Sequence, residues 1–289
     1  MGDNVSPVLC KRRELRAARR SARASGKSLI GSPMIEYKKF IYLDVYKTGS
    51  THIHFLLKKI VKDKPVRVKR HAPLTKGRPF TWKGGKLVFA TVRNPWDWYV
   101  SMWAYGHTVE NPLYEHIKQG FGQEKLNELY EMDNPKVAFP KWLKSMHDPA
   151  FLAQALKGHR LPTSGLMGFM GFYTYRFMRV TMPYPEIFLR KLFINSMDGA
   201  IAAQKKWAMY DVLMKSETLD EEFADFAARR GKDLGFSDKA VDIINKQAEK
   251  HKNVSKRTLE SYRDYYTEEL RELVATRDRF FIDLFGYKF

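Results

Sequence analysis

The order of apolar and polar positions predicts a strand that runs directly into a helix near the start of the chain. Residues 39–46 are rich in β-branched and aromatic side chains and alternate only weakly, which is typical of a strand covered on both faces. Residues 51–62 place their apolar side chains on one stripe of a helix. That stripe contains Ile53, Leu56, Leu57, Ile60 and Val61. The pattern therefore predicts a strand, a tight turn and a helix.

The same arrangement recurs further along the chain. Apolar segments predict strands over residues 66–70, 86–92 and 210–215. After the second of these, Asn94 suits a helix N-cap and Pro95 the first helical position, so we expect a helix that runs through Trp103. After the third, Thr218 and Glu221 have the spacing of a capping box, which predicts the start of another helix.

Alternating strands and helices predict the fold class. An amphipathic pattern over residues 267–284 adds a closing helix. Together the elements favour an α/β three-layer sandwich with a central, mainly parallel sheet. Ligands in such sheets bind at the carboxyl ends of the strands. Lys47, His71 and Arg93 each follow a predicted strand, so we expect them to lie along one edge of the sheet.

The chain divides into an arm and a single domain. Residues 1–36 form a basic arm that ends near the breaker sequence Gly-Ser-Pro at 31–33, and residues 37–289 are expected to share one core. Within that domain, residues 108–206 are helix-leaning and irregular, and we expect them to cover the acceptor side of the sheet. Their glycine-rich aromatic stretch at 165–175 fits a mobile lid, an acceptor wall or a buried helix.

Charge narrows the class of partners. The 289 residues carry a formal net charge of +19, which attracts phosphorylated small molecules, polyanions or anionic membrane. Cys10 is the single cysteine, and no apolar stretch reaches the roughly 20 residues of a membrane span, so we expect a soluble protein of the reducing cytoplasm. The arm's Arg, Ala and Ser content also resembles an organellar transit peptide.

The turn after the first strand has the features of a phosphate site. A phosphate at a helix N-terminus needs free backbone N–H groups, a glycine that permits close approach and a cation. The turn supplies all three in Lys47, Thr48, Gly49, Ser50 and Thr51. It is not a Walker A loop, because the lysine precedes the only glycine. An ATP-dependent kinase is therefore less well supported than another phosphate-binding enzyme.

A second anion-binding element follows the strand at 86–92. If the next helix begins at Pro95, Ser101 lies about two turns into it, on the face shared with the N-cap. Arg93 offers a permanently charged planar fork that suits phosphate, and it can converge with the Ser101 hydroxyl on one anion.

Both elements, in this order, resemble motifs of the sulfotransferases. Residues 46–51 resemble the family's 5′-phosphosulfate loop, and residues 92–101 resemble its 3′-phosphate motif, with the same arginine-to-serine spacing. The family's donor is 3′-phosphoadenosine 5′-phosphosulfate (PAPS). The resemblance implies that Lys47 and the turn after it hold the 5′-phosphosulfate, while Arg93 and Ser101 hold the 3′-phosphate. It also implies the family's P-loop-NTPase-like fold.

Further similarities indicate a branch of the family. Residues 215–219 and 262–289 look like a strand-end motif and the closing segment of Golgi-type and bacterial members. Lys256 and Arg257 fall where such proteins carry a basic loop over the nucleotide. The cytosolic branch usually has a tryptophan where this chain has His52, and its Arg-Lys-Gly segment does not occur here. The chain is thus more similar to the carbohydrate sulfotransferases.

The resemblance implies in-line transfer of a sulfuryl group from PAPS to a hydroxyl of a glycan, glycolipid or small alcohol. Lys47 would neutralise the leaving phosphate and His71 would act as the base. No Cys/His cluster occurs, so no metal is expected. The arm is a candidate for peripheral contact with anionic membrane, and oligomeric state is left open. The alternatives are a basic protein that binds nucleic acid without sequence preference, although no reader motif for specific nucleic acid is found, and a kinase with a nonstandard loop.

Overall fold

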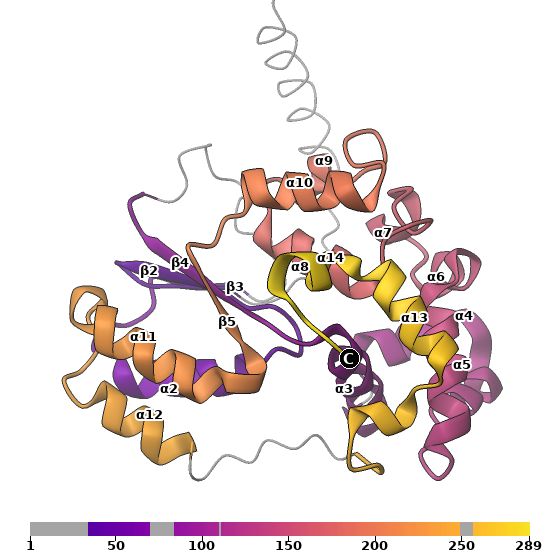
Figure 1. Ribbon diagram of the computed structural model, residues 1–289, viewed down its shortest axis with the longest axis horizontal. Coiled ribbons are helices and arrows are strands. Elements are labelled where there is room, and N and C mark those ends of the chain that lie inside the picture. The colour runs from indigo at the N-terminus through magenta and orange to yellow at the C-terminus, as the bar shows by residue number, and fades with distance from the viewer. Residues whose placement is uncertain (1–33, 70–83, 110, 249–256) are drawn as a thin grey trace, which may run out of the picture.

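The computed structural model describes residues 34–69, 84–109, 111–248 and 257–289 as an α/β fold around one five-stranded sheet (Figure 1). The strand order is β3-β1-β2-β4-β5. In chain order the strands are β1 (Met34–Glu36), β2 (Phe40–Leu43), β3 (Arg67–Lys69), β4 (Leu87–Val92) and β5 (Val212–Lys215). The strands that the sequence predicted are all present, each somewhat shorter than its apolar pattern.

The sheet is mixed, which corrects the expectation of a mainly parallel one. β2 pairs with β4 and β4 with β5 in parallel, but β1 pairs antiparallel with both β2 and β3. The sequence analysis placed β1 inside the arm. Because only residues 37–39 separate β1 from β2, the connection can form a hairpin but not the crossover that a parallel pair requires. The fold therefore begins at or before residue 34, whereas residues 1–33 lie outside the described part of the chain.

Four of the strands nevertheless end at the same edge. Since β1 runs opposite to both β2 and β3, these two strands point the same way, and Met34 aligns with the last residue of each, Leu43 and Lys69. The parallel pairings give β4 and β5 the same direction. β2, β3, β4 and β5 therefore all end at the carboxyl edge, where the sequence analysis placed the site.

Helices cover both faces of the sheet because alternate strand residues are apolar on each side. Phe40, Tyr42 and Phe89 face one core cluster, which also contains residues of α2 (Ser50–Ile60), α11 (Leu219–Leu234) and α12 (Ala240–Ala248). Ile41, Leu43, Val88 and Ala90 face the other cluster, together with residues of α3 (Pro95–Val109) and α8 (Phe172–Thr181). Figure 1 shows these two groups of helices on opposite sides of the strands.

The region at 108–206 is helical, as expected. Besides the end of α3 and all of α8, it contains α4 (Pro112–Leu129), α5 (Pro135–His147), α6 (Pro149–Ala155), α7 (Arg160–Thr163), α9 (Pro185–Phe188) and α10 (Met197–Trp207). Its glycine-rich stretch belongs to the core rather than to a lid: the Tyr173 ring stacks between Trp98 and Phe281, with ring centroids 4.3 and 4.0 Å away. Across the described residues, no helix has the length and apolarity to cross a membrane.

The closing segment is two helices, not the single helix that its pattern predicted. α13 (Glu268–Arg277) and α14 (Arg279–Phe285) are separated at Asp278, which is fully buried. The Asp278 carboxylate accepts hydrogen bonds from the Tyr99 hydroxyl at 2.7 Å and from the Thr174 N–H and hydroxyl at 2.9 and 2.6 Å. The chain leaves helical geometry at the residue that ties α13 and α14 to α3 and α8.

We expect Asp278→Ala to lower the free energy of unfolding by at least about 3 kcal/mol, because three buried donors would lose their acceptor and each such loss costs about 1–3 kcal/mol. Urea unfolding followed by circular dichroism measures the change. Asp283→Ala, at a more exposed carboxylate of α14, is the control and should cost less than about 0.5 kcal/mol. An Asp278→Ala protein as stable as this control would show that the carboxylate does not hold the helices together.

The helix after β5 begins without the expected capping box. The short 3₁₀ turn η1 (Ser216–Thr218) leads into α11, and no side-chain hydrogen bond caps that helix. The Thr218 hydroxyl instead donates to Glu222 at 2.5 Å, and the other Glu222 oxygen accepts from the Lys215 N–H at 3.0 Å. A second 3₁₀ turn, η2 (Tyr262–Tyr265), precedes α13.

Candidate functional site

The turn between β2 and α2 has the backbone of an anion site. Lys47 has φ +64°, in the left-handed region, and Gly49 has φ +89°. Gly49 is the N-cap of α2 and has no side chain. No side chain therefore caps the backbone N–H groups of the first helical turn. The partial positive charge of that terminus adds to the lysine charge.

Gly49 suits this position by its backbone conformation and by its close contact with a neighbouring helix. A Cβ at this position would lie 2.6 Å from Cδ2 of Leu219, the first residue of α11, and the positive φ disfavours any other residue. The close packing of Leu219 against the turn brings the start of α11 beside the start of α2. The two helix N-termini consequently line one pocket.

Thr48 has a structural role that the sequence analysis did not foresee. Its side chain is fully buried, and its hydroxyl donates to the Val45 carbonyl at 2.6 Å and shares a 2.6 Å hydrogen bond with the Thr91 hydroxyl of β4. The Thr91 hydroxyl in turn lies 3.1 Å from that of Tyr42. The Thr48 side chain therefore anchors the turn to the sheet, which leaves only its backbone for a ligand, whereas Ser50 and Thr51 line the pocket.

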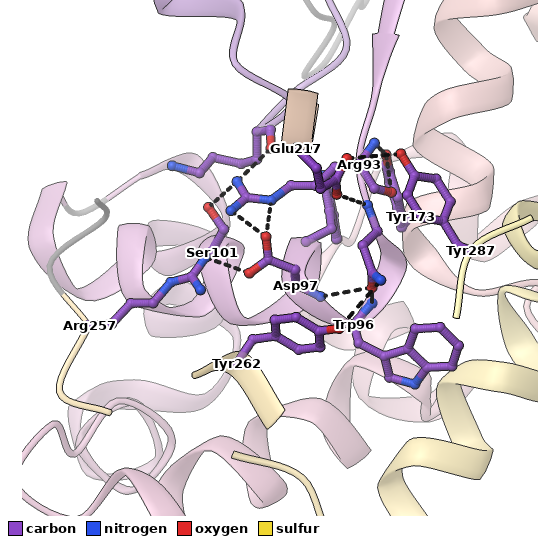
Figure 2. A network of polar contacts seen from close by, with 12 residues as sticks. Arg93, Trp96, Asp97, Ser101, Tyr173, Glu217, Arg257, Tyr262 and Tyr287 are labelled. Atoms are coloured by element: carbon purple, nitrogen blue, oxygen red, sulfur yellow. Dashed lines mark hydrogen bonds and ion pairs between the residues drawn. The ribbon is translucent and has the colours of Figure 1, made fainter. Parts of the chain in front are cut away.

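Arg93 and Ser101 converge, as their spacing predicted. Asn94 caps α3 by accepting the Trp96 N–H at 3.0 Å, which fixes the helix start. The Arg93 Nη1 then donates to the Ser101 hydroxyl at 3.1 Å and to the Lys47 carbonyl at 3.2 Å. This second bond joins the turn after β4 to the turn after β2. Figure 2 shows the Arg93 guanidinium directed towards Ser101 and Asp97.

Asp97 organises the cationic side of the site, and the sequence analysis missed it. Its Oδ2 accepts from the Arg93 Nε and Nη2 at 2.7 and 2.6 Å, and its Oδ1 pairs with the Arg257 Nη2 at 2.6 Å (Figure 2). Asp97 lies in the first turn of α3, four residues after Arg93, which lies just before the helix. Opposite charges at this spacing can form an ion pair. That spacing was visible in the sequence.

Lys47 completes a cluster of positive charge. Its Nζ lies 4.0 Å from the ring centroid of Tyr105, which continues the face of α3 that carries Ser101. Burial, followed by the charges of Arg93 and Arg257, lowers the pKa of Lys47 to about 8. Three cations and the Asp97 carboxylate gather at this side of the pocket, where positive charge therefore exceeds negative charge; the carboxylates Glu217, Asp220 and Glu221 also line the pocket.

These groups line one pocket of about 780 Å³, within the range of pockets that hold cofactors. Its far wall comes from η1 and the first turn of α11. There Glu217 accepts from the Asn94 N–H at 2.6 Å and from the Tyr287 hydroxyl at 3.1 Å. His52 and Asp220 meet across the pocket with 2.5 Å between Nε2 and Oδ1, a pair that the sequence analysis also missed because the partners are 168 positions apart. The pocket-lining residues are Tyr46, Lys47, Gly49, Ser50, Thr51, His52, Arg93, Asp97, Ser101, Tyr105, Ser216, Glu217, Thr218, Leu219, Asp220, Glu221 and Ala248.

Two of the predicted site residues, His71 and Lys256, lie outside the described residues. β3 ends at Lys69, two positions before His71 and at the same edge of the sheet as the end of β2. The catalytic role of His71 remains a prediction. Arg257, the first described residue after Lys256, is part of the cluster.

Metal ligation has no visible candidate in the part of the chain that the structure describes, where no group of three or more His, Cys, Asp and Glu side chains is arranged to hold an ion. His52 and His54 contact different carboxylates, Asp220 and Asp44. The described pocket thus offers cations and backbone N–H donors at the turns after β2 and β4, and carboxylates in η1 and the first turn of α11.

Comparison with known proteins adds one finding. A family model described as "Sulfotransferase family" matches residues 34–288, which include the whole sheet and every described residue of the pocket. No curated protein and no solved structure gives a significant match.

Proposed function

The chain belongs to the sulfotransferase family, and from this premise we propose that it transfers a sulfuryl group from PAPS to the hydroxyl of an acceptor. The observation that carries the proposal is the gathering of Lys47 and Arg93 in one pocket beside the N-terminus of α2, with Arg257 joined to them through the Asp97 carboxylate. PAPS carries negative charge at two positions, and the pocket offers anion-binding residues from two turns, one before α2 and one before α3.

Each end of the donor has its own candidate residues. The 5′-phosphosulfate lies against the backbone of Gly49, Ser50 and Thr51 and the Lys47 ammonium, where a helix N-terminus and a cation act together. The 3′-phosphate binds the Arg93 guanidinium and the Ser101 hydroxyl, which are already 3.1 Å apart and hence need little rearrangement. In this proposal the helix-covered sheet is the three-layer, P-loop-NTPase-like scaffold of the family.

The reaction is an in-line displacement. The acceptor oxygen bonds to sulfur while the bond from sulfur to the bridging phosphate oxygen breaks, and the leaving adenosine 3′,5′-bisphosphate gains one negative charge. Lys47 and the α2 backbone stabilise that charge as it grows. The acceptor proton passes to a base, for which we propose His71.

The acceptor enters beside Tyr46 and Tyr105, which line the pocket at the lysine end. The guanidinium of Arg176 packs on the Tyr46 ring, 4.8 Å from its centroid. Partly exposed aromatic rings can pack against apolar faces of sugar rings or against lipid groups. This end of the pocket therefore fits the proposed glycan, glycolipid or small-alcohol acceptors.

The test of the proposed function is transfer of label from ³⁵S-PAPS to a panel of sugars, glycolipids and alcohols. We expect transfer to at least one class without added ATP or divalent metal. Transfer from ATP that requires magnesium would instead identify a kinase. If adenosine 3′,5′-bisphosphate fails to raise the melting temperature while single-stranded RNA does, the protein is a polyanion binder.

Donor affinity should fall as the pH rises through the lowered pKa of Lys47. In the empty site the lysine carries its charge below about pH 8 and loses it above, whereas the second ionisation of a phosphate is complete near pH 7. A bound anion favours the charged lysine, so the dissociation constant of adenosine 3′,5′-bisphosphate should rise about tenfold between about pH 7 and about pH 9.5. Isothermal titration at each pH measures it.

Lys47→Arg is the matched control, since arginine keeps its charge throughout this range. Its affinity should vary little with pH even if it is weaker than that of the wild type. A wild-type profile as flat as the Lys47→Arg profile would mean that the Lys47 charge does not contact the nucleotide.

A further inference from the structure

The segment between α9 and α10, together with the end of α10, presents large apolar side chains to solvent. Leu192 is 86% exposed, Phe193 45% and Trp207 36%. Phe188 links them, since its ring centroid lies 5.8 Å from that of Phe193 and 5.3 Å from that of Trp207. We call the exposed residues Leu192, Phe193 and Trp207 the apolar tip. Figure 1 places α9 and α10 at one extremity of the fold.

Cations surround the apolar tip. Arg190 and Lys191 directly precede it, and Lys205 and Lys206 precede Trp207; all four are exposed. The Lys206 Nζ lies 5.3 Å from the Trp207 ring centroid. Within the described ranges, none of the four forms an ion pair with a carboxylate, in contrast to Arg279, which pairs with Asp198 and Asp283.

Single exposed apolar residues are ordinary, but a group of them ringed by cations marks an interaction surface. Leucine and phenylalanine gain free energy on entering hydrocarbon, and tryptophan favours the headgroup region between hydrocarbon and water. Each lysine or arginine near an anionic lipid surface contributes about 1 kcal/mol of attraction. The apolar tip therefore suits the lipid interior, and the four cations around it suit the anionic headgroups.

We propose that the apolar tip docks this protein on an anionic lipid surface, with Leu192 and Phe193 inserted among the acyl chains and the four cations against the headgroups. A second copy of the chain is a poorer occupant. A two-fold symmetric dimer through this surface would place the same four cations of each copy opposite one another, and like charges at close range repel.

Docking through the tip leaves the donor pocket accessible. Trp207 precedes β5, and the intervening chain is fixed where the Met209 N–H donates to the Thr181 carbonyl and the Asp211 N–H to the Val88 carbonyl, near the start of β4. The tip therefore lies towards the amino edge of the parallel strands, whereas the pocket lies at their carboxyl edge. Docking is thus independent of the proposed reaction, and vesicles should not change nucleotide affinity.

The test is sedimentation of the full chain with phosphatidylcholine vesicles, with and without phosphatidylserine. We expect the wild type to bind only the phosphatidylserine vesicles, less at high salt, and the Leu192→Ser/Phe193→Ser double variant to partition at least about tenfold more weakly. Phe55→Ser, at a phenylalanine that is 39% exposed on α2, is the matched control and should bind like the wild type. The basic arm is present in every sample.

A second readout follows Trp207 directly. Brominated lipids should quench part of the tryptophan fluorescence of the wild type and less of that of Trp207→Phe. The proposal is overturned if the wild type does not bind the anionic vesicles, or if the double variant binds as tightly as Phe55→Ser, in which case the arm alone provides attachment. A dimer in sedimentation equilibrium that the double variant abolishes would also overturn it, because a second copy would then cover the tip.

Discussion

Replacing Arg93 with alanine is expected to weaken the binding of adenosine 3′,5′-bisphosphate about a hundredfold or more, while the protein remains folded. The variant loses the guanidinium that we place against the 3′-phosphate. It also removes one of the two partners of the Asp97 carboxylate, which in the wild type pairs with Arg93 through Oδ2 and with Arg257 through Oδ1. A less neutralised carboxylate would then lie where the phosphate binds. Both effects oppose the anion, and a hundredfold change corresponds to about 2.7 kcal/mol.

Isothermal titration with two nucleotides separates these contributions. Adenosine 5′-monophosphate lacks the 3′-phosphate, so its affinity should fall much less in Arg93→Ala than that of the bisphosphate. Arg229→Ala removes an exposed arginine paired with Asp225 on α11 and should bind both nucleotides like the wild type. Equal losses for the two nucleotides would contradict the assignment of Arg93 to the 3′-phosphate.

Replacing His71 with alanine is expected to lower the transfer rate by about a hundredfold to ten thousandfold, which is the range attributed to general acid–base catalysis. The affinity for adenosine 3′,5′-bisphosphate should stay unchanged. An imidazole with an ordinary pKa of about 6.5 accepts a proton near neutral pH, and Lys69 and Arg70 directly before it favour its neutral form.

The measurement is single-turnover transfer from ³⁵S-PAPS to the best acceptor of the panel. His116→Ala, at a histidine of α4 that does not line the pocket, is the control and should retain the wild-type rate. Full activity in His71→Ala would place the base elsewhere, and loss of nucleotide affinity together with rate would make His71 a structural residue of the donor site.

The local part of the fold followed from the sequence because local rules determine it. β2, the glycine turn and the apolar stripe of α2 are all encoded within residues 39–62, and the Asn94 cap of α3 depends only on the residues next to it. The convergence of Arg93 with Ser101 needed only the helical repeat, once the start of α3 was known.

The errors occurred where distant residues decide the structure. β1 has only three residues, too few for a visible alternation, and its strand geometry depends on pairing with both β2 and β3. Asp278 interrupts an otherwise helical pattern because Tyr99 and Thr174, far away in the chain, donate to its carboxylate. Periodicity reports on burial along one element and carries no information about such partners.

The site was predicted as a set of positions but not as a network. Thr48 belongs to a motif whose glycine, serine and lysine line the pocket, yet its hydroxyl bonds to Thr91 inside the sheet. From the sequence alone, a motif residue that lines the pocket cannot be told from one whose side chain is bonded inside the sheet. Asp97 shows the converse: its spacing from Arg93 indicates an ion pair, but its second bond, to Arg257, closes across 160 positions.

The most direct test of the account is a crystal structure of the protein with adenosine 3′,5′-bisphosphate. We predict that the 5′-phosphate accepts hydrogen bonds from the backbone of residues 49–51 and contacts the Lys47 Nζ, and that the 3′-phosphate contacts the Arg93 guanidinium and the Ser101 hydroxyl. A nucleotide bound away from the edge where β2 and β4 end, or one whose phosphates leave Lys47 and Arg93 uncontacted, would contradict the proposal that these groups form a single donor site.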